Sequence, residues 1–273
     1  MKPAAGIGTL FFLLSLVFLF QETNDIETTL VTIRNRKLAE AAGGARMAQI
    51  TDLHISRLGS RERRLQNAIE RLDPDVIFIT GDLVASDAGI KPCIELIATM
   101  TKRRTVIAVL GNNDHSYREN RVDTKLLVRK LREAGARVLR NESVRLQCDG
   151  TESPPLYVVG LDDNFLWYDD YFRAMTNVPA HVPKILLAHS PGIVEKIPAE
   201  EVDLVLSGHT HGGQIVLPFI GALYTNPSLL SWKRFVAGMY KEGTTLYVNR
   251  GIGSAVLPVR LFSRPEITVF KFE

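Results

Sequence analysis

The chain has 273 residues, of which 45% are hydrophobic and 23% are charged. This composition is typical of a folded protein with a large core and excludes an intrinsically disordered chain. The 33 basic and 30 acidic residues give a formal net charge of +3, so we expect no nucleic-acid partner. Two cysteines, Cys93 and Cys148, are too few for a disulfide scaffold or a four-thiolate zinc site.

The N-terminal segment is weakly polar to apolar from Ala4 to Phe20 and follows the basic residue Lys2. A helix of this length measures about 25 Å, near the lower limit for crossing the hydrocarbon core of a bilayer. No small-x-small cleavage pattern follows the run, so we expect residues 1–22 to form a signal anchor that makes the chain a single-pass membrane protein. A cleaved signal peptide and a peripheral segment are the alternatives. Basic residues stand on both sides of the run and leave the orientation open.

Beyond residue 22 the hydrophobic pattern alternates between strands and helices. Strands are expected at Thr28–Arg34, Arg46–Thr51, Val76–Ile79, Val106–Leu110, Tyr157–Val159, Ile185–Ala188, Leu204–Leu206, Leu246–Asn249 and Ile267–Phe272. Helices are expected at Arg61–Leu72, at Cys93–Lys102 and around Leu127, Leu131 and Ala134. No repeat or low-complexity linker divides this stretch. The pattern predicts an α/β fold with one domain over residues 46–273, preceded by a linker and a leading strand over residues 23–45.

Polar side chains with metal-ligand chemistry follow five of the predicted strands. They are Asp52 and His54, Asp82, Asn112, His189, and His209 with His211. An aspartate after a strand is usually a turn residue, and a single histidine there usually packs into the core. Independent turns would not place carboxylates, imidazoles and an amide at successive strand ends, where ligands bind in α/β sheets. The combination therefore predicts a metal site.

The types and number of these side chains indicate which ions would bind. Carboxylate, imidazole and amide ligands without a thiolate favour manganese, iron or zinc over a structural zinc. Seven ligands exceed the needs of one ion but suit two divalent ions that share a bridging carboxylate. Two such ions hold a hydroxide between them and bind the oxygens of a phosphoryl group during in-line displacement. We therefore expect hydrolysis of a phosphoester.

The order and spacing of these motifs resemble the calcineurin-like metallophosphoesterases over roughly residues 46–273. The motifs are Asp52-x-His54, Gly81-Asp82, Gly111-Asn112-x-Asp114, His189 and Gly208-His209-Thr210-His211-Gly212-Gly213-Gln214. The last motif, with Asn249-Arg250-Gly251-Ile252-Gly253 and the tail Arg260…Arg264-Pro265-Glu266, is similar to a bacterial subgroup of exported or membrane-anchored phosphodiesterases. The resemblance thus places the expected anchor in the bacterial inner membrane.

The resemblance also implies a fold and a set of roles. The fold would be a four-layer αββα sandwich, two β-sheets flanked by helices, which here carries an N-terminal hydrophobic anchor helix. The first metal would be bound by Asp52, His54 and His211, the second by Asn112, His189 and His209, and Asp82 would bridge both.

The chain departs from the family pattern at Asn113, where a histidine usually protonates the leaving oxygen. An asparagine donates a hydrogen bond but is no general acid near neutral pH. The substrate could have a good leaving group that needs no acid. Alternatively His115, two residues later, supplies the proton, or activity is weak while metal binding is kept. We therefore treat Asp82, Asn112, Asn113 and His115 as the candidate catalytic residues.

Other predictions concern substrate and partners. Arg250 and Arg260 follow strands near the expected site and are candidates for binding phosphate oxygens, with structural salt bridges as the alternative. The segment Trp167–Phe172 is either an amphipathic helix with its rings on the core or a rim that contacts a lipid-like substrate or the bilayer.

The leading functional hypothesis is a hydrolase that depends on two divalent metals and cleaves a phosphodiester or pyrophosphate bond, with a metal-bridging hydroxide as nucleophile. A narrower alternative is a pyrophosphatase of lipid-linked nucleotides of the UDP-diacylglucosamine type. A metal-binding scaffold without turnover is the non-enzymatic alternative. The expected partners are thus a small-molecule or lipid phosphoester and, through the N-terminal segment, the membrane.

Overall fold

In a computed structural model, the described residues are 17–117, 121–148, 154–222, 234–255 and 257–273. Residues 17–24 are helical, whereas residues 1–16, which hold most of the predicted anchor, lie outside the described part. Among the described residues, no helix is both long enough and apolar enough to cross a membrane.

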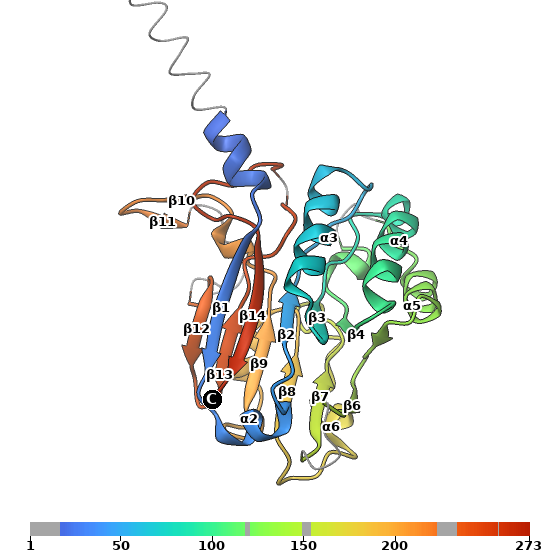
Figure 1. The fold of residues 1–273 in the computed structure, drawn as a ribbon, viewed down its shortest axis with the longest axis vertical. Helices are drawn as coiled ribbons and strands as arrows, with labels where there is room; N and C mark the ends of the chain where they lie inside the picture. The colour runs from blue at the N-terminus through green and yellow to red at the C-terminus, as the bar shows by residue number, and fades with distance from the viewer. Residues whose placement is uncertain (1–16, 118–120, 149–153, 223–233, 256) are drawn as a thin grey trace, which may run out of the picture.

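Two six-stranded sheets form the body of the molecule (Figure 1). The first has the order β1-β14-β2-β3-β4-β5, made of Glu27–Ile33, Glu266–Phe272, Met47–Ile50, Val76–Thr80, Thr105–Val109 and Arg137–Val138. The second has the order β12-β13-β9-β8-β7-β6, made of Gly238–Lys241, Thr245–Val248, Leu204–Ser207, Lys184–Leu187, Leu156–Gly160 and Glu142–Leu146. A two-stranded hairpin joins β10 (Val216–Leu217) to β11 (Gly221–Ala222).

Alternation along the strands explains how the sheets pack. In β3, Val76 and Phe78 point into an apolar layer between the two sheets, whereas Ile77 and Ile79 point into a layer on the outer face of the first sheet. Successive side chains of a strand lie on opposite faces, so a continuous apolar run indicates a strand that is buried on both sides. The parallel pairing of β2, β3 and β4 brings their carboxyl ends to one edge of the sheet.

Helices cover the outer faces. The outer face of the first sheet packs against α3 (Ser60–Leu72), α4 (Ile90–Thr101) and α5 (Thr124–Glu133), which fill one side of Figure 1. Short elements, α6 (Tyr171–Met175) and a 3₁₀ turn at Pro191–Glu195, cover the outer face of the second sheet. A further helix, α2 (Arg36–Ala42), packs three residues into the layer between the sheets. The expectation of an α/β fold with two main sheets and helices is confirmed.

Other sequence-based expectations were incomplete. The strands β5, β6 and β12 and the helix α2 were not predicted, because they are short or carry no clear apolar face. Of the Trp167–Phe172 segment, only residues from Tyr171 onward are helical, and only the Tyr171 ring is buried. The exposed rings of Trp167, Tyr168 and Phe172 contradict the first alternative for this segment, an amphipathic helix with its rings on the core.

A buried polar group joins the two sheets beneath the strand ends. The side-chain amide of Gln49 on β2 donates to the hydroxyl of Thr80 on β3 and to the carbonyl of Ser207 on β9, both at 2.9 Å. A buried amide is costly unless it is hydrogen-bonded, so these contacts fix the relative position of the sheets. The residues after β2, β3 and β9 are thereby held close together.

Candidate metal centre

The seven predicted ligands follow strands of both sheets. Asp52, Asp82 and Asn112 follow β2, β3 and β4 of the first sheet, and the three histidines at 189, 209 and 211 follow β8 and β9 of the second. His54 lies two residues beyond Asp52. The edge where the parallel strands end therefore gathers side chains from both halves of the sandwich, as the strand-end argument expected.

The backbone at these positions is unusual. Asp52, His54, Asp82, His209 and His211 all have positive φ, between 43° and 72°. This left-handed region is disfavoured for residues with a Cβ and costs about 1–3 kcal/mol at each position. Strain that is shared by five candidate ligands indicates that the surrounding structure holds them for a function rather than for stability.

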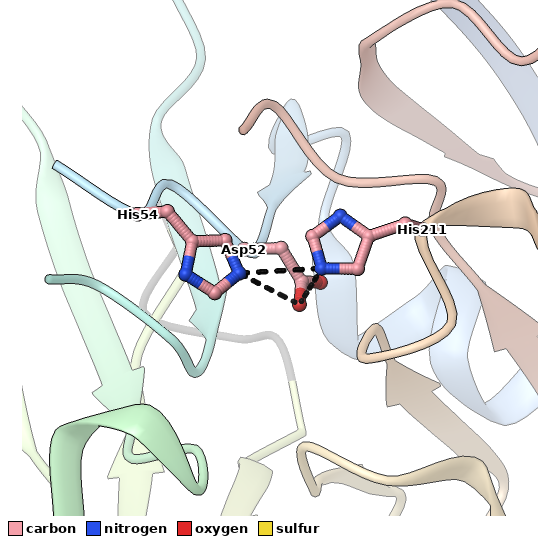
Figure 2. Close-up of side chains that lie close together, drawn as sticks. All are labelled: Asp52, His54 and His211. Atoms are coloured by element: carbon pink, nitrogen blue, oxygen red, sulfur yellow. Dashed lines mark hydrogen bonds and ion pairs between the residues drawn. The ribbon is translucent and has the colours of Figure 1, made fainter. Parts of the chain in front are cut away.

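Asp52, His54 and His211 form a first cluster (Figure 2). The Nε2 atoms of His54 and His211 are 3.2 Å apart, and Nε2 of His211 lies 3.4 Å from Oδ1 of Asp52. Oδ1 of Asp52 is buried and has no hydrogen-bond partner, whereas Oδ2 accepts bonds from the Thr51 hydroxyl and the His209 N–H. One oxygen of the carboxylate is thus fixed by the protein, and the other faces the two ring nitrogens.

Asp82, His189 and His209 form a second cluster. Nε2 of His189 lies 2.9 Å from Nδ1 of His209 and 3.4 Å from Oδ1 of Asp82. The other ring nitrogen of His189, Nδ1, donates a hydrogen bond to the carbonyl of Thr80 at 2.8 Å. This bond orients the ring and directs Nε2 into the cluster, as in histidines that bind metals.

The carboxylate of Asp82 belongs to the second cluster and also faces His54 of the first. Its Oδ2 is 3.5 Å from Nε2 of His54, and its Oδ1 is 3.4 Å from Nε2 of His189. The neighbouring Asn112 is buried, and its side-chain oxygen has no hydrogen-bond partner. Unpartnered buried oxygens that meet convergent imidazole nitrogens fit the donor set of divalent metals.

The electrostatics of the two clusters also suit metal binding. Burial lowers the pKa of His54 and holds the pKa values of His209 and His211 well below the usual range, so these imidazoles are neutral and able to bind an ion. Burial opposes the charges of Asp82 and His189, but their mutual attraction dominates. It lowers the pKa of Asp82 and raises the pKa of His189 to about 10. In the metal-free protein this pair is an ion pair.

Glycines allow the loops to approach this closely. A Cβ on Gly208 would overlap the Thr51 side chain and Oδ2 of Asp52, and a Cβ on Gly111 would overlap Oδ1 of Asp82. Both glycines belong to the motifs that were read from the sequence. Their role is to leave space for the carboxylates of the two clusters.

The loops after β3 and β4 are tied together by Asp114. Its buried carboxylate accepts bonds from the backbone N–H groups of Leu83, Val84 and Gly111 at 3.0–3.2 Å. Burial and the nearby Asp82 raise the pKa of Asp114 to about 7. Asp114 belongs to the sequence motif, but the sequence assigned it no role. In the structure it links the two loops and thereby positions Asp82 and Asn112.

The candidate proton donors lie in the same loop. The Asn113 side-chain amide donates to Oδ2 of Asp82. Nε2 of His115 is 2.6 Å from Oδ1 of Asp162, and the other oxygen of Asp162 accepts a bond from Arg140 at 2.8 Å. His115 is thus held by a carboxylate on the loop after β7.

The two candidate arginines have protein partners. The side chain of Arg250 bonds to the carboxylates of Glu266 at 3.1 Å and Glu27 at 2.8 Å. Arg260 is 0% exposed, and its guanidinium contacts Nδ1 of His211 at 3.2 Å and the carbonyl of Ser263 at 3.0 Å. Arg260 thus lies directly behind the first cluster.

Aromatic residues beside the second cluster were missed by sequence reasoning. The ring of Phe165 lies 5.0 Å from the ring of His209, and Tyr117 packs on Phe165 at 5.4 Å. Both rings come from loops, where no periodicity marks them. The one sequence feature that could have indicated them is their position in loops that follow strands of the two sheets, where functional residues concentrate.

Residues 45–213 match the sequence profile of the calcineurin-like phosphoesterases, and the chain belongs to this family. The chain is 33% identical over 258 residues to the uncharacterized metallophosphoesterase YkuE of Bacillus subtilis, covering 92% of this chain and 87% of that protein. It is 30% identical to the phosphodiesterase YaeI of Escherichia coli, covering 81% and 80%.

A third relative bears a more specific name. The UDP-2,3-diacylglucosamine pyrophosphatase LpxG of Chlamydia muridarum is 26% identical, and the match covers 92% of this chain and 90% of that protein. Relatives from Danio rerio and Bos taurus are named transmembrane proteins with a metallophosphoesterase domain, and the chain spans 55% and 62% of their lengths.

Proposed function

We propose that the chain is a hydrolase that uses two divalent metal ions to cleave a phosphodiester or pyrophosphate bond. The observation that carries this proposal is the position of Asp82, whose two oxygens lie 3.5 Å from His54 of one cluster and 3.4 Å from His189 of the other. A carboxylate between two sets of nitrogen ligands is suited to bridge two ions.

The proposed ligands divide between the ions. Asp52, His54 and His211 bind the first ion, Asn112, His189 and His209 bind the second, and Asp82 binds both. The buried oxygens of Asp52 and Asn112 that have no hydrogen-bond partner support this division. Manganese, iron and zinc suit the donor set. When bound, the ions supply Lewis acidity and the hydroxide nucleophile at neutral pH.

The protein itself would contribute position and charge. The Thr51 hydroxyl and the His209 N–H fix the carboxylate of Asp52, and Asn113 fixes that of Asp82. These bonds hold the ligands before a metal arrives, so little conformational entropy is lost on binding. The complete set of seven donors favours turnover over a scaffold that only binds metal.

The source of the proton for the leaving group is a separate question from the metal ligands. Because the Asn113 amide is bound to Asp82, we favour a substrate whose leaving group departs without a general acid. A nucleotide or a pyrophosphate has such a leaving group. His115, held by Asp162, is the second candidate to supply a proton.

The substrate class follows from this chemistry and from the relatives. A phosphodiester is the broader proposal, and a lipid-linked nucleotide pyrophosphate of the UDP-diacylglucosamine type is the narrower one. The name of the Chlamydia muridarum relative and the apolar N-terminal sequence support the narrower proposal. We also propose that this N-terminal sequence anchors the chain in the bacterial inner membrane as a single span.

The test is hydrolysis by the full-length protein loaded with manganese, iron or zinc. The substrates are bis-p-nitrophenyl phosphate and UDP-diacylglucosamine, and the metal content of the protein is measured in parallel. We expect two ions per chain and metal-dependent turnover. Asp82→Asn should lose both ions and activity, whereas His181→Ala, which changes an exposed histidine outside both clusters, should keep both. A folded, metal-loaded protein without turnover on either substrate would exclude the proposal.

A further inference from the structure

Three segments that are far apart in the sequence meet at one end of the sandwich. They are the helical residues 17–24, the hairpin of β10 and β11, and residues 257–264, which precede β14. Figure 1 shows the helical residues and the hairpin at the same end of the molecule, the end at which β2 terminates. Asp52 and His54 follow β2, so these segments lie at the end that carries the metal centre.

Hydrogen bonds connect the helical residues 17–24 to the loop of residues 257–264. The hydroxyl of Thr23 accepts a bond from the backbone N–H of Arg260 at 2.9 Å, and the buried carboxylate of Glu22 accepts one from Phe262 at 2.9 Å. Glu22 also pairs with Arg264. The rings of Phe18 and Phe262 are 5.8 Å apart. The helical residues are therefore docked on the domain rather than separate from it.

The hairpin is connected to the same loop. The backbone N–H of Val216 donates to the carbonyl of Leu261 at 2.9 Å, and the side chain of Gln214 donates to the carbonyl of Leu257 at 2.7 Å. Arg260, in the middle of this loop, contacts the ring of His211. The three segments thus form one connected surface. Arg260, which lies in this surface, directly contacts the candidate metal ligand His211.

This surface exposes large apolar side chains. Phe219 at the hairpin tip is fully exposed, its neighbour Ile220 is 71% exposed, and Phe20 is 60% exposed. We call the set of exposed apolar residues on the three segments the apolar collar; its members are Val17, Phe18, Phe20, Phe219, Ile220, Leu257 and Phe262. Single exposed apolar residues are ordinary, but a group on connected segments marks an interaction site.

The sequence indicates what covers the collar. The helical residues continue, toward the N-terminus, a sequence that is weakly polar to apolar from Ala4 and includes Leu10-Phe11-Phe12-Leu13-Leu14. Val17, Phe18 and Phe20 thus belong both to the collar and to the segment proposed to enter the bilayer. Phe219 and Ile220, at the hairpin tip, extend the same apolar surface sideways. A lipid surface fits this continuity because one bilayer can accept the N-terminal segment and the collar together.

We propose that the apolar collar docks on the surface of a lipid bilayer and holds the metal centre at the level of the lipid headgroups. The substrate of such a centre is an amphiphile whose phosphoester lies in the interface, a consequence that rests on the phosphoesterase function proposed above. Membrane contact by the collar is a property of its own and does not require turnover.

The first test measures contact with lipid directly. A single cysteine is introduced by Phe219→Cys in the full-length protein, labelled with an environment-sensitive nitrobenzoxadiazole probe and reconstituted in vesicles of phosphatidylethanolamine and phosphatidylglycerol. The matched control is Leu30→Cys, because Leu30 is 67% exposed on β1 and lies outside the apolar collar. Cys93 and Cys148 are buried, so labelling of the unchanged protein gives the background.

We expect the probe at position 219 to emit at shorter wavelength and to be quenched by spin-labelled lipids, while the probe at position 30 behaves as in water. Equal behaviour of the two probes would overturn the proposal. Shielding of position 219 that depends on protein concentration and occurs without vesicles would identify a second copy of the chain as the occupant and would also overturn it.

The second test separates docking from catalysis. Phe219→Glu combined with Ile220→Glu should lower hydrolysis of UDP-diacylglucosamine in vesicles by about tenfold or more, because two apolar side chains no longer enter the interface. Hydrolysis of soluble bis-p-nitrophenyl phosphate should be unchanged, and Leu30→Glu should change the hydrolysis of neither substrate. An equal effect on both substrates contradicts docking. Absence of turnover in every variant contradicts the proposed function alone and leaves the fluorescence test valid.

Discussion

Asn113 binds the carboxylate of Asp82 with both its backbone and its side chain. The backbone N–H donates to Oδ1 at 2.8 Å, and the side-chain amide donates to Oδ2 at 2.5 Å. Both oxygens that face the two clusters are therefore held by one residue. The resemblance described above implies a histidine at this position, and the asparagine found there stabilises the ionised form of a candidate bridging ligand.

A histidine at position 113 should change the dependence of the rate on the leaving group. For Asn113→His we expect faster hydrolysis of diesters with alkoxide leaving groups, by up to about 10²-fold, because general acid catalysis becomes available. Diesters of p-nitrophenol should be hydrolysed at nearly the same rate, since this leaving group needs no proton. The measurement is kcat/KM for a series of leaving groups, with metal content checked in each variant.

His115→Ala provides the comparison for this substitution. If His115 supplies the proton in the unchanged protein, its removal should slow only the substrates with poor leaving groups. If the leaving group needs no acid, the two proteins should have the same dependence on leaving-group pKa. Identical profiles for Asn113→His and the unchanged protein would contradict the argument that an acid is missing.

Metal binding should release a proton. The Asp82 carboxylate outweighs burial and raises the pKa of His189 to about 10, so His189 is protonated at neutral pH when no metal is bound. An ion that binds Nε2 must displace this proton, and the affinity for metal should rise about tenfold per pH unit between about pH 7 and 9. Calorimetric titration of manganese in two buffers with different ionisation enthalpies measures the number of protons released. A value near zero would show that His189 is neutral before metal binds.

The same pKa shift predicts how the stability of the metal-free protein depends on pH. The pKa of His189 is raised in the folded state, so the Asp82–His189 pair contributes its full stabilisation below the ordinary histidine pKa of about 6.5. This contribution should be lost progressively as the pH rises toward about 10. Denaturant unfolding of the chelator-treated protein at several pH values measures it, and His189→Asn should remove this part of the pH dependence.

The candidate ligands could be predicted from the sequence because each follows a buried apolar strand, and a parallel sheet brings such positions to one edge. The tertiary contacts that hold these ligands in place could not be predicted from the sequence. Thr23 and Arg260 are 237 residues apart in the sequence and meet only through the tertiary fold. Arg250 and Arg260 both looked available for phosphate, because a sequence does not show which guanidinium groups already have buried partners. Nor could periodicity find α2, which spans only seven residues.

Space at Gly208 should be essential for the first cluster. A methyl group there would overlap the Thr51 side chain and Oδ2 of Asp52, so Gly208→Ala should destabilise the fold by about 1–3 kcal/mol and lower metal occupancy at the first cluster. The control is Gly44→Ala, which has no atom within 4 Å of the new methyl group but a φ of +84°. The control should lose stability through backbone strain alone and keep its metal. Denaturant unfolding and metal analysis distinguish the two effects.

Arg260 and Arg250 should respond differently to replacement by lysine. Arg260 is fully buried, and its guanidinium bonds to the carbonyls of Gly253 and Ser263 and to the ring of His211. A lysine ammonium lacks the planar set of N–H donors that a guanidinium directs at these acceptors, and each unpaired buried group costs about 1–3 kcal/mol. For Arg260→Lys we therefore expect a lower Tm and weaker metal binding at the first cluster, with an unchanged KM once metal is saturating. This outcome would make Arg260 a positioning residue for His211.

Arg250 is partly exposed, and Arg250→Lys tests whether it binds phosphate oxygens. A raised KM with normal metal content would support substrate binding by Arg250, and a raised KM for Arg260→Lys at full metal occupancy would contradict the positioning role.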